Sequence, residues 1–181
     1  MLDPATSTEA SLTLGDSAGS KGELKNIERV QIGNAKTAGT SKFDVHGSWD
    51  FKNAGLYVAK GATATIHEGA SITDVERLKI ESGSTTKING TATIKRLFGK
   101  NGGGTLDVNG TLNVTGDGNE TDASTTPGKY INDVYLTKAT LNINAGGTVA
   151  LEQDAWDDVL NLTAGDDKVI TAATANNSTA D

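Results

Sequence analysis

One short phrase recurs along this chain: an alternating strand pattern, a glycine-containing corner, and a second alternating strand pattern. It is clearest in Ile88–Ile94 and Val108–Val114, which read INGTATI and VNGTLNV. Alternation of apolar and polar residues is typical of a strand with one buried face. Asparagine and glycine both tolerate positive φ, so the Asn-Gly pair predicts a sharp turn between two extended segments. Repetition of this phrase constrains the fold more than any other feature.

Three further segments carry the phrase with small changes at the corner. They are Phe43–Phe51, Ala64–Ile72 and Leu141–Leu151. The apolar residues that precede the five corners are spaced by 21, 22, 20 and 35 residues, and they are Val45, Ile66, Ile88, Val108 and Ile143. The excess in the last step falls in the Gly/Asp/Thr-rich stretch 115–129, which has the composition of a protruding loop.

A third, shorter strand is expected between successive corners. The candidates are Leu56–Val58, Leu78–Ile80, Val134–Leu136 and Val159–Leu162. A period near 20 residues without helical spacing is the signature of a solenoid, because one coil cannot bury its own inward aliphatic residues but stacked coils can. The sequence therefore predicts an all-β, single-domain β-solenoid, a parallel β-helix of about five or six coils of roughly 20–22 residues.

An antiparallel β-sandwich or jelly roll is the alternative fold, in which the Asn-Gly pairs would be ordinary hairpin turns. For the solenoid, we expect the domain to span residues 11–170, with the loop insert at 115–129. The polar residues 1–10 show no period and are expected to form a flexible N-terminal arm. Residues 171–181 are expected to form a polar C-terminal tail.

The whole-chain composition argues against several function classes. The net charge is −7 without any basic run or basic-aromatic stripe in the sequence, so nucleic acid is not an expected partner. The absence of cysteine excludes disulfides, thiol catalysis and cysteine-based zinc sites. No apolar run approaches membrane-spanning length, so no membrane insertion is expected. The first residues lack the basic and apolar regions of a secretory signal peptide.

The two histidines, His46 and His67, follow the pre-corner apolar residue in successive copies of the phrase. A solenoid would stack them one above the other, which makes a metal pair conceivable. The next two copies carry Asn89 and Asn109 at this position. We therefore expect a polar ladder at the corner rather than a metal site.

Two regions have oxygen ligands at a density that is typical of calcium sites, with Asp117, Asn119 and Asp122 in the insert and the pair Asp166–Asp167 further on. Neither region matches the twelve-residue EF-hand loop, which ends in a glutamate in register. The nonapeptide repetition of calcium β-rolls is also missing. No metal site is predicted from these residues.

A pair of carboxylates in a groove is the basis of glycosidase chemistry, and four acidic residues cluster in sequence: Glu68, Asp74, Glu76 and Glu81. Sugar-binding grooves also need aromatic platforms, and aromatic residues make up only 4% of this chain. We interpret the four carboxylates as solvated surface charges. The sequence thus predicts no catalytic, cofactor-binding or metal-binding residue.

The phrases VNGTLNV, INGTATI and LNINAGGTVAL resemble those of β-helical bacterial surface proteins, namely autotransporter passengers, filamentous adhesins and some surface-layer proteins. Similar phrases occur in virion proteins of tailed bacteriophages, in fibres and in capsid-decorating proteins. The resemblance covers roughly residues 27–162 and is periodic and compositional. It implies a non-enzymatic structural protein of an extracellular or virion assembly.

Within this resemblance, the short chain without an export signal favours a phage capsid decoration, cement or fibre-type protein on the virion surface. Such a protein would bind the major capsid protein or other assembly subunits and would form a homo-oligomer, with a trimer as the expected order. The alternative is a secreted or cell-surface adhesin or surface-layer protein, or a fragment of one. A carbohydrate-active β-helix enzyme is the minor alternative.

Overall fold

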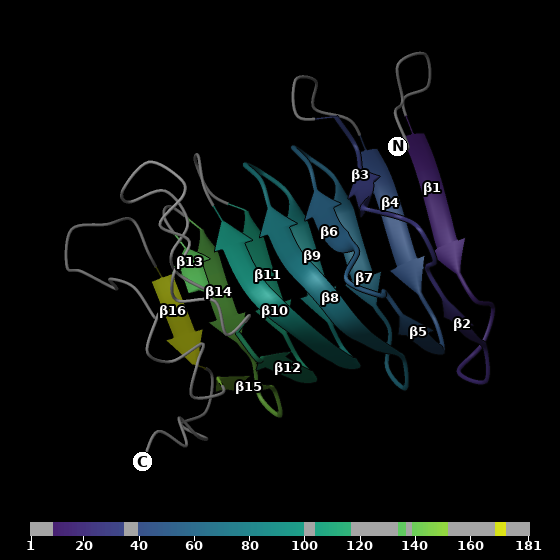
Figure 1. The fold of residues 1–181 in the computed structure, drawn as a ribbon. Coiled ribbons are helices and arrows are strands. Elements are labelled where there is room, and N and C mark those ends of the chain that lie inside the picture. Colours follow the sequence, from purple (N-terminus) through teal and green to yellow (C-terminus); the bar gives the residue numbers. More distant parts are fainter. Residues whose placement is uncertain are drawn as a thin grey trace, which may run out of the picture.

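The computed structural model describes residues 9–34, 40–99, 104–116, 134–136, 139–151 and 169–172, and their only regular structure is β-strand. The strands form two sheets, one of seven strands and one of nine, in which every pairing is parallel. Figure 1 shows the strands side by side as successive rungs along one axis.

The seven-stranded sheet supplies one side of every coil. In spatial order, which is also chain order, its strands are β1 (Glu9–Leu14), β4 (Thr40–Val45), β7 (Thr63–Ile66), β9 (Thr85–Ile88), β11 (Thr105–Val108), β14 (Thr140–Ile143) and β16 (Val169–Ala172). Each strand pairs with the strand of the next coil, as a solenoid requires.

The nine-stranded sheet supplies the other two sides. Its second-side strands are β2 (Lys21–Glu23), β5 (Ser48–Asp50), the first half of β8 (Ser71–Ile80), the first half of β10 (Thr91–Gly99), β12 (Thr111–Val114) and β15 (Thr148–Leu151). Its third-side strands are β3 (Arg29–Ile32), β6 (Gly55–Val58), the second halves of β8 and β10, and β13 (Val134–Leu136). A register shift between Ala92 and Ile94 and a positive φ of 51° at Asp74 mark the transition between the two sides.

The parallel pairing confirms the solenoid and shows that the hairpin alternative is wrong. The strands on either side of Asn89–Gly90, β9 and β10, lie in different sheets. The pre-corner residues pair directly in the order Val45, Ile66, Ile88, Val108 and Ile143, so the spacing found in the sequence is the register of the sheet. The seven-stranded sheet adds β1 and β16 to these five rungs, which is one more than the upper expectation of six coils.

Three of the four expected third-side strands are confirmed in β6, β8 and β13, whereas Val159–Leu162 lie outside the described residues. The predicted loop insert at 115–129 falls between β12 and β13, but its first residues still belong to the coil. Thr115 and Gly116 still donate backbone hydrogen bonds to the carbonyls of Ile94 and Lys95 in the coil before, at 2.9 and 3.1 Å. Residues 117–133 lie outside the described part of the chain.

The domain boundaries also shift slightly at both ends. β1 includes Glu9 and Ala10, which the sequence assigned to the arm, and β16 includes Thr171 and Ala172, which it assigned to the tail. Residues 1–8 and 173–181 are not described, so the arm and the tail stay predictions.

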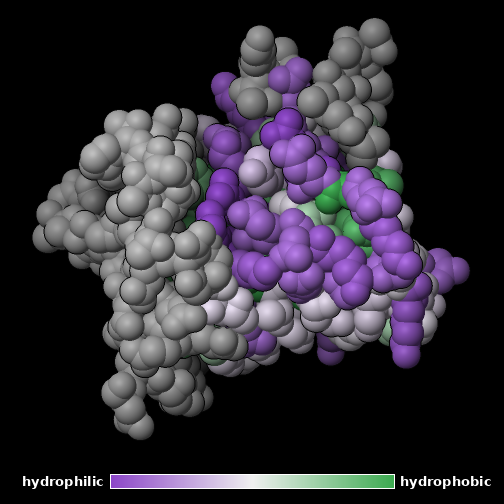
Figure 2. Space-filling model, viewed as in Figure 1, coloured by the Kyte–Doolittle hydropathy of each residue, from purple (hydrophilic) through white to green (hydrophobic). Residues whose placement is uncertain are grey.

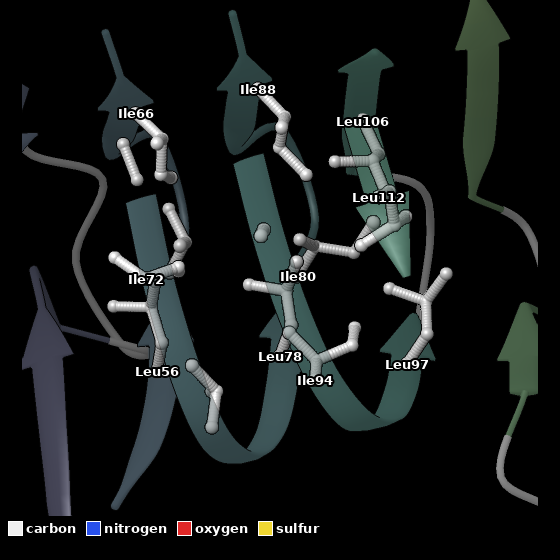
Figure 3. Packing of buried hydrophobic residues seen from close by; sticks show 14 of the residues in the cluster. Leu56, Ile66, Ile72, Leu78, Ile80, Ile88, Ile94, Leu97, Leu106 and Leu112 are labelled. Carbon is white, nitrogen blue, oxygen red and sulfur yellow. The ribbon is translucent and has the colours of Figure 1, made fainter. Parts of the chain in front are cut away.

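The core consists of aliphatic columns that run along the stack. Val45, Ile66, Ile88 and Val108 are all 0% exposed and pair in succession. Figure 3 shows Ile66, Ile88 and Leu106 of the seven-stranded sheet facing Ile72, Ile94 and Leu112 of the other sheet. Each such side chain contributes about 1.5–3 kcal/mol by leaving water, so the columns are the main stabilising feature.

The glycines at the Asn-Gly corners are needed for a reason other than the one expected from sequence. Gly90 and Gly110 do not have positive φ, unlike Gly47 and Gly69 at the two preceding corners. Instead, a Cβ on Gly90 would overlap the backbone oxygens of His67 and Ala70 in the coil before, and a Cβ on Gly110 would overlap that of Gly90. The Asn-Gly corners therefore use glycine because adjacent coils approach each other too closely for a side chain.

We predict that Gly90→Ala lowers the free energy of unfolding by about 3 kcal/mol or more, because the added methyl group forces two coils apart. Gly19→Ala is the matched control, since its nearest neighbouring atom would lie 3.9 Å away and its φ is not positive. The control should change stability by less than about 0.5 kcal/mol. Chemical denaturation followed by circular dichroism measures both, and equal effects would contradict the close-approach explanation.

Candidate functional site

The corner that follows the seven-stranded sheet brings the two histidines together. The rings of His46 and His67 stack with centroids 4.1 Å apart and an interplanar angle of 14°. His67 Nε2 lies 2.8 Å from Asp44 Oδ1, an outward residue of β4 in the coil before. The stacking predicted from the sequence is therefore confirmed.

The same position continues as a ladder of asparagine amides in the following coils. Asn109 Nδ2 donates to Asn89 Oδ1 at 2.8 Å, and Asn144 Nδ2 donates to Asn109 Oδ1 at 2.9 Å. Asn109, in the middle of this ladder, donates one hydrogen bond and accepts another along the stack axis. The polar ladder expected from the sequence is confirmed, and its chemistry is cohesion between coils.

No group of three or more histidine or acidic side chains is placed to hold a metal ion within the described ranges. The stacked imidazoles present parallel ring planes, and the Nε2 atom of His67 already meets a carboxylate. The candidate calcium ligands Asp117, Asn119, Asp122, Asp166 and Asp167 all lie outside the described residues.

The outer faces carry files of hydroxyl residues that repeat from coil to coil. On the seven-stranded sheet the paired residues are Thr63, Thr85, Thr105 and Thr140. On the second side they are Ser48, Ser71, Thr91, Thr111 and Thr148. Such a surface presents a hydroxyl group at each rung.

The four clustered carboxylates lie along one stretch of the coil, and three of them have a cation nearby. Glu68 is exposed at the corner before β8, Asp74 lies within β8, and Glu81 follows it. Glu81 Oε1 lies 2.6 Å from Lys79 Nζ, and Asp74 Oδ1 lies 3.5 Å from Lys95 Nζ. These carboxylates therefore form ion pairs with lysine side chains on the coil surface.

The third side assembles a basic and aromatic face that the linear sequence does not show. Arg29, Arg77 and Arg96, which are all the arginines of the chain, occupy one file, with Gly55 filling the place between the first two. Glu76 Oε1 lies 3.4 Å from Arg77 Nη2 and 3.8 Å from Arg96 Nη1, so an acidic residue neutralises part of this charge.

Aromatic rings lie among these cations. The guanidinium carbon of Arg29 and the Nζ atom of Lys79 are each 5.5 Å from the ring centre of Tyr57, within cation–π range. Arg77 lies 6.0 Å from the ring centre of Phe98. The expectation that this chain has no basic-aromatic stripe holds for the linear sequence only. The missed signal is the recurring tripeptide of a charged residue, arginine and an aliphatic residue, at 28–30, 76–78 and 95–97.

The first coil, made of β1, β2 and β3, forms one end of the stack. Its inward residues Leu12, Leu14, Leu24 and Val30 are only partly buried against the core. An open hollow beside them is lined by Lys25, Asn26, Ile27, Glu28 and Lys52. Figure 2 shows hydrophobic surface toward the end of the stack where β1 and β3 lie. Ile27, in this hollow, is 41% exposed.

Comparison with protein-family models, with curated proteins and with solved structures finds no significant match to this chain. Among the described residues, there is no helix of the length and apolarity needed to cross a membrane.

We predict that Asn109→Ala lowers the free energy of unfolding by about 1–2 kcal/mol, because it removes both hydrogen bonds at the middle of the ladder. Asn113→Ala is the matched control, since the amide of Asn113 makes one long hydrogen bond to Thr93 Oγ1 at 3.4 Å. Denaturant unfolding of the two variants measures the difference. An equal loss in both would show that the ladder amides add no cohesion.

The turn between β1 and β2 in the first coil offers a test of local electrostatics. Ser20 Oγ donates to Asp16 Oδ1 at 2.9 Å and Ser17 Oγ donates to the same atom at 3.2 Å. These bonds, that of Ser20 first, hold the pKa of Asp16 below its ordinary value. Because the folded-state pKa is lowered, the contribution to stability is present above the unfolded-state pKa and is lost as pH falls through the folded-state pKa.

We predict that Ser20→Ala raises the pKa of Asp16 toward its ordinary value and reduces the acid dependence of stability in this pH range. Titration of the Asp16 carboxyl carbon by NMR measures the pKa directly. Ser17→Ala, which removes the longer bond, should give a smaller rise. A larger rise in the pKa of Asp16 in Ser17→Ala than in Ser20→Ala would show that the Ser17 bond has the greater effect on this carboxyl.

Proposed function

We propose that this chain is a non-enzymatic structural module of an assembly at a virion or cell surface. The observation that supports this most is the way in which the outward side chains are used. Asn89, Asn109 and Asn144 bond to one another along the stack axis, and hydroxyl residues repeat in files on two sides. Such a coil gains cohesion and a uniform polar exterior from its side chains.

The axial geometry supports the cell-surface setting, an adhesin or surface-layer type of protein. A parallel stack has a single long axis and gains length by the addition of coils, while each coil contacts only its neighbours. These properties suit a rigid spacer that carries a binding region away from a surface. The resemblance of the repeated phrases to autotransporter passengers and filamentous adhesins agrees with this setting.

A phage capsid decoration, cement or fibre-type protein is the second candidate, and a different observation favours it. The partly buried residues Leu12, Leu14 and Val30 give the stack an apolar end. An apolar end bounded by unpaired strand edges fits docking onto another protein, such as a capsid subunit. In both settings, the proposed partners are protein subunits, including further copies of this chain.

The setting is tested by quantitative mass spectrometry of two fractions from the organism that encodes the chain: purified virus particles and washed cell envelopes. We expect the chain in the envelope fraction, at a copy number comparable to other structural components. Enrichment in particles at a fixed ratio to the capsid protein would establish the second candidate instead. Recovery in the soluble cytoplasmic fraction alone would contradict both.

The absence of catalysis is tested with the purified chain and a panel of bacterial and plant polysaccharides, by measurement of newly released reducing ends. We expect no release above a heat-denatured control. Cleavage that disappears in the Glu76→Gln variant would contradict the proposal, because that substitution keeps the shape of the side chain and removes its carboxylate.

A further inference from the structure

The first coil has an interior that its own neighbours do not cover. Leu12 and Leu14 of β1 are partly exposed, whereas Phe43 and Val45, their partners one coil further in, are 0% exposed. Val30 of β3 shows the same contrast with its partner Leu56. Ile27, beside them, is 41% exposed and is the single large hydrophobic residue among those described that is classed as exposed.

The backbone of the first coil also presents an open edge on all three sides. Within the described residues, β1, β2 and β3 each pair with one strand only. The carbonyl of Leu14 accepts from His46, that of Ser20 accepts from Ser48, and that of Glu28 accepts from Gly55. Because the N–H and C=O groups alternate in direction from one residue to the next along a strand, those of the even-numbered residues point toward the second coil.

The odd-numbered residues therefore direct their N–H and C=O groups away from the stack. They are Ser11 and Thr13 of β1, Lys21 and Glu23 of β2, and Arg29 and Gln31 of β3. Each strand thus presents two residues ready for pairing, next to an apolar interior. This combination is a template for another set of β-strands.

We propose that a second copy of this chain covers this end, head to head, with the first coils of the two copies in contact. A twofold axis through the middle of one side of a three-sided coil exchanges the other two sides. With the axis through Leu12, β1 pairs antiparallel with β1 of the partner copy. β2 then lies over β3 of the other copy, and β3 over β2.

The register that results pairs the residues at the centre of each strand as follows. On β1, Leu12 lies opposite Leu12 of the second copy, Ala10 lies opposite Leu14, and Ser11 exchanges backbone hydrogen bonds with Thr13. On the other two sides, Glu23 faces Arg29 and Lys21 faces Gln31, with Gly22 opposite Val30. The edge-facing residues of the three strands are thereby in hydrogen-bonded pairs, and the inward residues Ala10, Leu12, Leu14 and Val30 meet apolar residues or glycine, whereas Ile32 meets Ser20.

The charge pattern selects a second copy over an unrelated strand. The contact sets the carboxylate of Glu23, which also pairs with Lys25 and Lys52 of its own copy, against the guanidinium of Arg29, twice by symmetry. An isologous contact of this kind closes as a dimer, whereas a head-to-tail contact would continue into a filament. The proposed order is therefore two, which differs from the trimer implied by the resemblance to capsid-decorating proteins.

The first experiment uses the 181-residue chain. Sedimentation equilibrium over a range of concentrations should give a dimer for the natural chain. Ser11→Pro removes an N–H that points to the open edge without removing a hydrogen bond to β4, and edge strands tolerate proline at such positions. It should weaken dimerisation by about tenfold or more, whereas Ser11→Ala, which keeps the N–H, should leave it unchanged.

The second experiment tests the charge pair with two complementary variants. Glu23→Arg gives a chain with two cations at the contact, and Arg29→Glu gives a chain with two carboxylates. Each variant alone should dimerise about tenfold or more weakly because like charges face each other. A mixture of the two should form a mixed dimer, which native mass spectrometry identifies when one chain carries an isotope label.

Circular dichroism and thermal melting of each monomeric variant separate loss of contact from loss of fold, and melting temperatures close to that of Ser11→Ala are expected. A natural chain that remains monomeric at all concentrations overturns the proposal. A trimer also overturns it, as does a dimer that survives both Ser11→Pro and Glu23→Arg. Recovery of dimers in the mixed sample, but in neither variant alone, supports this twofold contact.

Discussion

The close parallel approach of successive coils is the constraint on which this structure depends. Aliphatic columns such as Val45, Ile66, Ile88 and Val108 are fully buried only because each coil lies directly on the one before. That approach brings backbone atoms together at the corners, where a Cβ on Gly90 or Gly110 would overlap a carbonyl oxygen. Buried columns and bare corners are thus two consequences of the same geometry. The asparagine ladder fits into the same repeat because three successive coils present Asn89, Asn109 and Asn144 at the same corner position.

The repeat period was enough to predict the fold and even the sheet register. A residue that must be inward in every coil recurs at a fixed interval, so the spacing of Val45, Ile66, Ile88 and Val108 gave the pairing directly. The role of the corner glycines was not predictable in the same way. Positive φ and close backbone approach both select glycine, and only coordinates distinguish Gly47, with a φ of 76°, from Gly90.

The candidate surfaces were harder to predict because they are assembled across coils. His46 and His67 could be stacked from sequence since both stand next to a recognised corner. Arg29, Arg77 and Arg96 belong to the third side, where the coils differ most in length and no single phrase defines the register. The partial exposure of Leu12 and Val30 is likewise invisible in a linear pattern, because their alternation is that of ordinary inward residues. Exposure depends on position in the stack rather than on the local sequence.

The end coil of a solenoid is suited to binding another chain for a physical reason. In the middle of the described stack, strands such as β7, β9 and β11 pair on both edges, inward side chains such as Ile66, Ile88 and Val108 are fully buried, and the corner amides bond to one another. At the first coil, β1, β2 and β3 pair on one side only with other described strands, and the same kind of apolar residue is only partly buried. An edge strand beside partly exposed leucines favours further pairing by the same interactions that hold the coils together. Recognition at such an end therefore needs no special site, since it repeats the contact between one coil and the next.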